Sequence, residues 1–237
     1  MTTALELLSL LPWADWFALA WFFGAWIGYA VFARRRSRVK ASVLAATSRI
    51  RHQWMMQVTH REVRIVDGTI VQSLASSPSF FASTTILIIG GLLAVLGTSE
   101  KATGLVQEIP FAAQTPVLVF DLKLLVLTAI FVYAFFRFTW SLRQYTFGAM
   151  LVGAAPEARE FLADPALSRE DFARRAGRVL SLAAETFNDG LRAYYLAFAA
   201  LGWFVSAQVF ALATVGVVYI LYQREFHSDV LAVLRES

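Results

Sequence analysis

Asp121 and Lys123 form the one oppositely charged pair inside a long apolar run of this sequence. A charged side chain near the middle of a membrane helix costs about 2.5–3.5 kcal/mol, so such residues are candidates for function. Residues two apart on a helix point roughly 200° away from each other, so these two cannot pair within their own helix. We expect Lys123 to extend outward to the lipid headgroups. Asp121 is expected to face another helix, either as a structural acceptor or on a path for ions or protons.

Other polar residues occur within the apolar runs or at their inner ends. Gln208 and the run 83–85 fit hydrogen bonding between helices, worth about 0.6 kcal/mol on average in membranes. Acids and bases near 137 and 185–192 fit either a salt-bridge network that holds helices together or a gate or anionic-ligand pocket. The candidate pore or gate residues are Asp121, Thr128, Gln208, Arg137, Glu185, Asn188 and Arg192.

Motifs for catalysis and for metal binding are absent from the sequence. The chain has no cysteine, which excludes disulfides, thiolate metal sites and a thiol nucleophile. Its three histidines lack the spacing of a metal site, and no glycine-rich phosphate loop occurs. We therefore predict a protein that is not an enzyme and that has no cofactor and no metal. A lipid-modifying enzyme built on Glu185, Asn188 and Arg137 is a third alternative.

The elements that position these residues are long apolar helices. Hydrophobic residues make up 58% of the 237 residues and charged ones 16%, well below the roughly 25% charged residues of soluble domains. A helix needs about 20 mostly apolar residues to cross a bilayer. Four segments qualify, at 16–33, 79–97, 117–136 and 194–222. The sequence predicts an all-α polytopic membrane protein, with four transmembrane helices in a single membrane domain over 1–237.

The basic residues predict the orientation of these helices. Seventeen of the 21 Lys and Arg residues lie in 34–79 and 137–192, whereas residues 1–15 contain none. Loops rich in Lys and Arg stay on the cytoplasmic side. We therefore expect 34–78 and 137–193 to be cytoplasmic, with the N-terminus and the tail after Gln223 both outside. The +4 net charge is explained by membrane contact, and we expect no nucleic acid partner.

The two basic segments are predicted to be helical. Apolar residues recur every three or four positions between Arg36 and Val58, as in an amphipathic helix that lies on the headgroups, packs within the protein or docks on a partner. Asp67-Gly68 fits a helix break better than a hairpin turn. From Arg169 to Tyr222 one continuous helix is expected, about 80 Å long. Residues expected to contact anionic lipid are Arg34, Arg35, Arg36, Arg38 and Lys40.

Four segments carry a resemblance to a known family: His60–Asp67, Ser79–Thr85, Phe136–Tyr145 and Glu185–Arg192. With these the chain resembles a family of uncharacterised bacterial inner-membrane proteins that contain a domain of unknown function and are predicted to have four spans. The resemblance covers nearly the whole chain. It implies location in the bacterial inner membrane and implies no activity.

Two functions fit the sequence. One is a self-associating membrane protein that conducts or transports ions or small solutes, because small residues at positions 20, 24 and 28 and at 90 and 94 favour close helix packing. The other is an accessory or scaffold subunit of a larger membrane complex whose basic helices bind anionic lipid or partner proteins.

Overall fold

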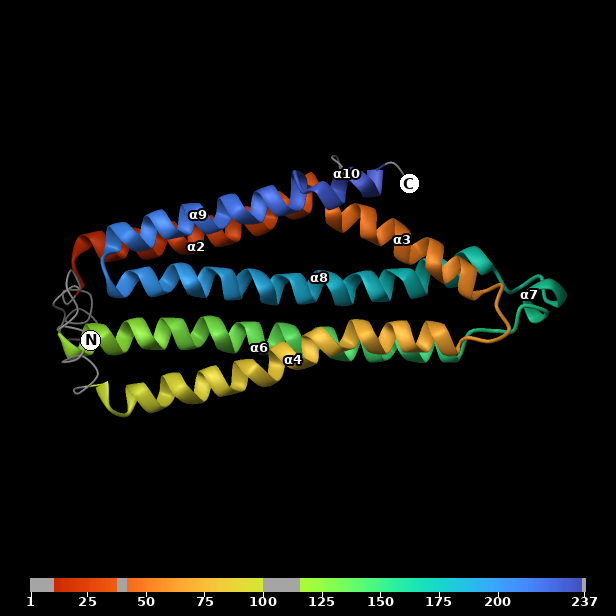
Figure 1. Ribbon diagram of the computed structural model, residues 1–237, viewed down its shortest axis with the longest axis horizontal. Coiled ribbons are helices and arrows are strands. Elements are labelled where there is room, and N and C mark those ends of the chain that lie inside the picture. The colour runs from red at the N-terminus through yellow and green to blue at the C-terminus, as the bar shows by residue number, and fades with distance from the viewer. Residues whose placement is uncertain (1–10, 38–41, 100–115, 236–237) are drawn as a thin grey trace. The chain divides into compact units, whose positions relative to one another are not determined.

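The computed structural model describes residues 11–37, 42–99 and 116–235, most of which are helical (Figure 1). Within those residues no strand occurs, which confirms the predicted all-α class. The elements are α2 (Trp13–Arg36), α3 (Val43–Val58), α4 (Ile65–Leu96), α6 (Val117–Gly153), α7 (Glu160–Ala163), α8 (Arg169–Leu201), the 3₁₀ turn η1 (Gly202–Phe204), α9 (Ala207–Phe226) and α10 (Asp229–Arg235).

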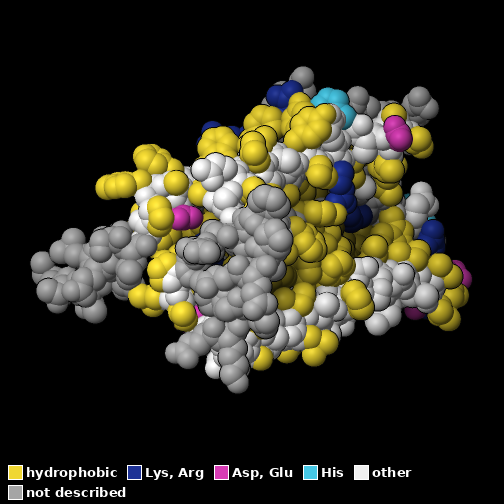
Figure 2. All heavy atoms as spheres, turned by 60° about the vertical axis from the view of Figure 1, so that its left-hand side comes forward, with side chains coloured by type: hydrophobic (Ala, Val, Ile, Leu, Met, Phe, Trp, Pro, Cys, Tyr) yellow, Lys and Arg dark blue, Asp and Glu magenta, His cyan; other side chains and the backbone are white. Residues whose placement is uncertain are grey.

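Four helices are long and apolar enough to cross a membrane, as the sequence predicts. They are α2, α4, α6 and the stretch Ala207–Leu234. Hydrophobic side chains cover much of the described surface seen in Figure 2, as expected for helices that face lipid. The 37 residues of α6 extend about 55 Å at 1.5 Å per residue, nearly twice the thickness of the hydrocarbon core. Part of this helix must therefore lie outside the core.

The chain divides into two compact units, where we had expected a single domain. Unit 1 comprises Met1–Arg36, Thr85–Tyr133 and Arg192–Gln223, and unit 2 comprises Ser37–Thr84, Ala134–Leu191 and Arg224–Ser237. Helices α4, α6 and α8 contribute residues to both units.

The described residues of unit 1 include parts of α2, α4, α6, α8 and α9, because the last residues of α8 pack beside the apolar helices. Residues Ala193, Leu196 and Ala200 of α8 are each at most 2% exposed. Ten residues of α8 belong to this unit. Most of these ten residues are at least partly buried by protein side chains, so this segment does not need the apolar length of a helix exposed to lipid.

The predicted continuous helix from Arg169 to Tyr222 is wrong. Helix α8 ends at Leu201, η1 covers Gly202–Phe204, and α9 begins at Ala207. At Gly202 a β-carbon would lie 3.1 Å from the Val209 side chain. The turn therefore packs closely against the first residues of α9. The sequence shows no proline here, and the periodicity of α8 gave no sign of the break.

Helices α2 and α9 run side by side in the same direction. Three levels of contact show this: Trp203 bonds to Asp15, the Phe22 and Phe210 rings are 4.9 Å apart, and Leu221 packs with Tyr29 and Ala33. Parallel helices that cross a membrane begin on one side and end on the other. The residues that follow Arg36 and those that follow Gln223 therefore emerge on the same side.

Unit 2 has its own core, formed by α3, the first part of α4, the last part of α6 and the first part of α8. Met55, Leu180 and Ala183 are fully buried in it. Gly177 lets α3 approach α8 closely, since a β-carbon there would lie 3.0 Å from the His52 α-carbon. The amphipathic helix thus packs within the protein, one of the alternatives that the sequence left open. The helix break predicted at Asp67-Gly68 is wrong in position, because both residues lie at the start of α4 and the break between α3 and α4 falls at residues 59–64.

The C-terminal tail belongs to unit 2, where α10 packs against α3. The backbone N–H of Leu44 also donates to Glu225 Oε1 at 3.1 Å. Two segments in contact cannot lie on opposite sides of a bilayer. The contact therefore favours a common side for α3 and the tail, in place of the expectation that 34–78 lies inside and the tail outside.

The shared side of α3 and α10 can be tested by cysteine labelling, because the natural chain has no cysteine. We expect Ile50→Cys on α3 and Val233→Cys on α10, both at exposed positions, to react with an impermeant maleimide from the same side of the membrane. Trp13→Cys, at the start of α2, should react from the other side. Labelling of Ile50→Cys and Val233→Cys from opposite sides would contradict the arrangement.

Candidate functional site

A buried polar cluster in unit 1 joins three helices at the α8–α9 turn. Lys123 of α6 is 3% exposed, and its Nζ donates to the Trp203 carbonyl oxygen at 2.8 Å. The same ammonium lies 5.5 Å from the centre of the Trp203 ring, which favours a cation. Trp203 Nε1 in turn donates to Asp15 Oδ1 at 2.5 Å. The carbonyl and the indole N–H of Trp203 thus both have hydrogen-bond partners inside the protein.

The expectation that Lys123 reaches the headgroups is therefore wrong. Helix breaks leave backbone carbonyls without partners, and a buried carbonyl needs a donor. Lys123 supplies that donor to the carbonyl of Trp203. The role of Asp15 and Trp203 was not predicted. The available signal in the sequence is an acidic residue and a tryptophan, each near the end of an apolar helix.

The remaining pore candidates of unit 1 do not converge on a common lumen. The Thr128 hydroxyl donates to the Leu124 carbonyl of its own helix at 2.8 Å. Gln208 is exposed and lines a shallow groove between the starts of α2 and α9. Arg192 lies with its guanidinium 5.6 Å from the Tyr29 ring centre. Asp121 is half-buried, and its Oδ1 is buried without a hydrogen-bond partner among the described residues.

Interhelical hydrogen bonding, expected for the polar run 83–85, is present at one of its residues. The hydroxyl groups of Thr85 and Tyr194 lie 2.6 Å apart and link α4 to α8 within unit 1. By contrast, a β-carbon added at Gly24, Gly28 or Gly90 would meet nothing within 4 Å. The small-residue positions of α2 and α4 therefore do not serve close packing within the described chain.

In unit 2 the boundary cluster contains a buried ion pair between α6 and α8. Arg137 bonds to Asp189, whose side chain is 7% exposed. Arg137 Nε is buried without a partner among the described residues. An ion pair removed from water keeps its stability only while both charges are present, because the remaining charge would be buried alone. The expected ion pairing between an acid and a base of two helices is thus present here.

Aromatic packing surrounds this ion pair. Phe138 lies 5.3 Å from Phe81 of α4 and 5.6 Å from Phe187 of α8, measured between ring centres. A β-carbon at Gly190 would lie 2.5 Å from the Phe138 ring, so only glycine admits the ring without a shift. One turn further along α6, Ser141 donates to the Ala183 carbonyl at 2.7 Å. The segments Ser79–Thr85, Phe136–Tyr145 and Glu185–Arg192 therefore meet partly in this cluster.

Glu185 and Asn188 do not join the ion pair in any described bond. Glu185 Oε1 accepts from Arg178 at 2.9 Å, along the same helix, and Asn188 is half-buried on α8. Arg51 of α3 faces this region, where burial lowers its pKa and the nearby charges of Tyr145 and Glu185 oppose that shift. The geometry supports a helix clamp more directly than a ligand pocket.

A second network in unit 2 ties together two chain connections. Arg64 donates through its two terminal nitrogens to the carbonyls of Ala155 and Pro156, both at 2.5 Å. Arg169 donates to the Ala158 carbonyl at 2.8 Å and lies 2.5 Å from His60 Nδ1. Residues 59–64, between α3 and α4, are thereby fixed to residues 154–168, between α6 and α8.

The segment 60–67 is also fixed internally. Buried Asp67 accepts from Trp54 Nε1 at 2.7 Å and bonds to Arg61. This network was not predicted, because the sequence shows the arginines and the acid but not the distant carbonyls that they reach.

Of the predicted anionic-lipid contacts, Arg34, Arg35 and Arg36 form the last turn of α2, and Arg34 and Arg35 are exposed. Arg38 and Lys40 lie outside the described residues. Across the described ranges there is no cluster of three or more His, Asp or Glu side chains suited to a metal ion.

These features define a helical protein with four candidate membrane-spanning helices and no recognisable catalytic centre in its described residues. A family model described as "Protein of unknown function, DUF599" matches residues 17–230. The chain therefore belongs to this family, in agreement with the resemblance found in the sequence. No curated protein and no solved structure matches the chain.

Replacing Lys123 by methionine should destabilise unit 1. The Trp203 carbonyl would lose its donor, and an unsatisfied buried acceptor costs about 1–3 kcal/mol. The measurement is the midpoint of unfolding by circular dichroism as a denaturing detergent replaces a mild one. Thr128→Val on the same helix is the control, because that hydroxyl bonds only to its own helix in the described contacts, and it should leave the midpoint nearly unchanged. Equal effects of the two variants would contradict the role of Lys123.

The Arg137–Asp189 pair should show strong coupling in a double-mutant cycle. Asp189→Asn and Arg137→Met should each be destabilising, by about 3–5 kcal/mol for a fully buried pair and less here, because Arg137 is 29% exposed. The double variant should lose much less than the sum, since neither charge then remains alone. Additive losses in the same unfolding assay would show that the pair does not act as a unit.

Proposed function

We propose that this chain is a non-enzymatic integral protein of the bacterial inner membrane that acts as an accessory subunit and binds a partner protein through one end of unit 2. The observation that carries the proposal is a set of exposed apolar side chains on, or directly beside, two connections that are bonded to each other. The four apolar helices support the membrane location.

The exposed set is called the tip patch and comprises Val63, Ile65, Val66 and Leu162. Their exposed fractions are 71%, 77%, 65% and 81%, respectively. Exposed apolar groups of this size mark interaction surfaces when they gather in water. Arg64 and Arg169 fix the two connections that carry them to each other.

Rigid loops favour binding, because ordering a backbone residue costs about 1–2 kcal/mol and this cost is already met in the free protein. The arginine bonds to carbonyls provide such rigidity for residues 59–64 and 154–168. A connection held open with its apolar side chains outward is a common design for protein recognition.

Helix length argues against membrane contact for this patch. Ile65 is 31 residues from Leu96, which is about 47 Å along α4. If Leu96 lies near one face of a hydrocarbon core about 30 Å thick, Ile65 lies well beyond the other face. With positively charged segments on the cytoplasmic side, the tip patch is in the cytoplasm. A protein is then the occupant that matches its chemistry.

Conduction of ions remains a second candidate, supported by the buried Oδ1 of Asp121, which has no hydrogen-bond partner in the described part of the chain. It needs a lumen that Asp121 and Gln208 share, either within the chain or between copies. Purified protein in liposomes should therefore show no ion flux under the first proposal. Flux that Asp121→Asn alters would favour the second.

Photocrosslinking in membranes tests the partner site. We expect p-benzoylphenylalanine at position 162 or 63 to yield one adduct of defined mass, and the same residue at exposed position 233 of α10 to yield none. Arg64→Ala should weaken the adduct at 162, because it releases residues 155 and 156 from the α3–α4 connection.

Three outcomes separate the alternatives. A partner identified in the adduct by mass spectrometry, with binding reduced about tenfold by Leu162→Asp, supports the accessory role. An adduct of twice the chain mass would assign the patch to self-association instead. Equal adducts at all three positions would show that the patch has no specific occupant.

A further inference from the structure

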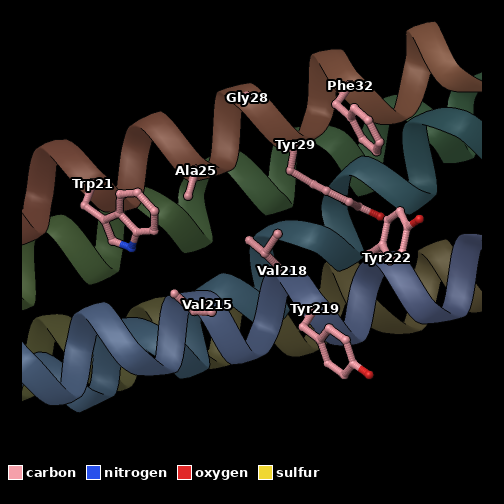
Figure 3. Close-up of a pocket in the computed structure, with 9 residues that line it drawn as sticks. All are labelled: Trp21, Ala25, Gly28, Tyr29, Phe32, Val215, Val218, Tyr219 and Tyr222. Atoms are coloured by element: carbon pink, nitrogen blue, oxygen red, sulfur yellow. The ribbon is translucent and has the colours of Figure 1, made fainter.

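A groove in unit 1 lies between α2 and α9 and is lined almost entirely by apolar and aromatic side chains (Figure 3). Its volume is about 560 Å³, within the range of roughly 300–1,000 Å³ typical of ligand sites. Figure 3 shows Trp21 and Tyr29 extending from α2 toward α9, with Ala25 and Gly28 between them. The lining residues of α9 are Val215, Val218, Tyr219 and Tyr222.

The length of the groove matches one leaflet of a bilayer. From Trp21 to Phe32 there are 11 helical steps, or about 17 Å at 1.5 Å per residue. Half of a hydrocarbon core about 30 Å thick is about 15 Å. The small residues Ala25 and Gly28 lie between the rings, and a β-carbon at Gly28 would meet nothing within 4 Å. The dimensions suit one extended hydrocarbon chain.

Positive charge lies at one end of the groove. Phe32 lines the groove, and Arg36 places its guanidinium carbon 5.3 Å from the Phe32 ring centre. Arg192 similarly lies 5.6 Å from the centre of the Tyr29 ring. Arg34 and Arg35, in the same last turn of α2, are exposed. Guanidinium groups bind phosphate with paired hydrogen bonds.

We propose that this groove is a binding site for an anionic phospholipid of the inner leaflet, with one acyl chain between α2 and α9 and the phosphate at Arg34–Arg36. Burial of an acyl chain supplies affinity at about 0.8 kcal/mol per methylene, and the arginines supply preference for negative headgroups. The site is independent of the partner proposed for unit 2.

A second copy of the chain fits the groove less well. Copies in one membrane share their orientation, so a side-by-side contact at α2 would bring two Arg34–Arg36 clusters to the same depth. Like charges facing each other in this way oppose association. A negatively charged lipid removes that repulsion, which makes the phospholipid the better match.

Two glycines on α2 provide a matched pair of variants. Gly28 lines the groove and Gly24 does not, while a β-carbon at either position would meet nothing within 4 Å. Gly28→Leu should therefore fill the groove without disturbing the fold, and Gly24→Leu should add the same side chain to α2 outside it. Far-UV circular dichroism and the unfolding midpoint verify that both variants are folded.

The experiment measures binding of dioleoylphosphatidylglycerol to the purified full-length chain by native mass spectrometry in mild detergent. We expect Gly28→Leu to weaken the first binding event at least about tenfold and Gly24→Leu to leave it unchanged. Dioleoylphosphatidylcholine should bind about fivefold more weakly than phosphatidylglycerol. Replacing Arg34 and Arg35 by glutamine should abolish that preference, and inorganic phosphate alone should show no binding.

Equal binding by Gly28→Leu and Gly24→Leu would overturn the groove as the site. Equal binding of the two lipids by the natural chain would overturn the role of the arginines. The same spectra report the number of chains in each particle. A loss of dimers in Gly28→Leu, without a change in lipid binding, would assign the groove to a second copy and overturn the lipid proposal.

Discussion

The turn between α8 and α9 is the constraint on which the arrangement of unit 1 depends. A helix that stops inside a protein leaves backbone carbonyls without donors, and burial makes each one costly. Here the Lys123 ammonium donates to the Trp203 carbonyl, and Asp15 accepts from the Trp203 indole. One break in α8–α9 is thereby tied to the starts of α2 and α6. With this turn in place, α9 runs parallel to α2.

The four-helix prediction was correct about which helices are apolar enough to span a membrane, but it did not foresee that the last residues of α8 pack beside them in unit 1. Hydropathy detects helices that lipid surrounds, because only these must be apolar on nearly every side. One face of the end of α8 is covered by protein, where Ala193 and Ala197 are at most 2% exposed. A segment of this kind needs small residues for packing and little hydropathy. Its contribution was therefore merged with α9 into one predicted span.

The candidate sites were predictable to the extent that partners were close in sequence or followed from helix geometry. Acids and bases of α6 and α8 were expected to meet, and Arg137 does bond to Asp189. The network of Arg64 was not foreseeable, since its acceptors are carbonyls 91 and 92 residues away. A carbonyl belongs to every residue, so the sequence contains no signal for it. The placement of Lys123 failed for the same reason, because its acceptor is also a carbonyl.

The two proposed binding surfaces differ in a way that follows from their surroundings. In lipid, an exposed apolar side chain carries no free-energy cost, so exposure alone does not mark the groove between α2 and α9 as a site. A ligand there must be defined by shape and charge. Gly28 provides the shape, and the arginines at the end of the groove provide the charge. In water, exposure itself is the cost. Leu162 at 81% and Ile65 at 77% exposed are then unfavourable unless something covers them. The bonds of Arg64 to the Ala155 and Pro156 carbonyls hold these two connections to each other in the open arrangement. A protein that gained nothing from an open tip would lose little by letting it collapse, and this retained exposure is the physical reason to look for a partner there.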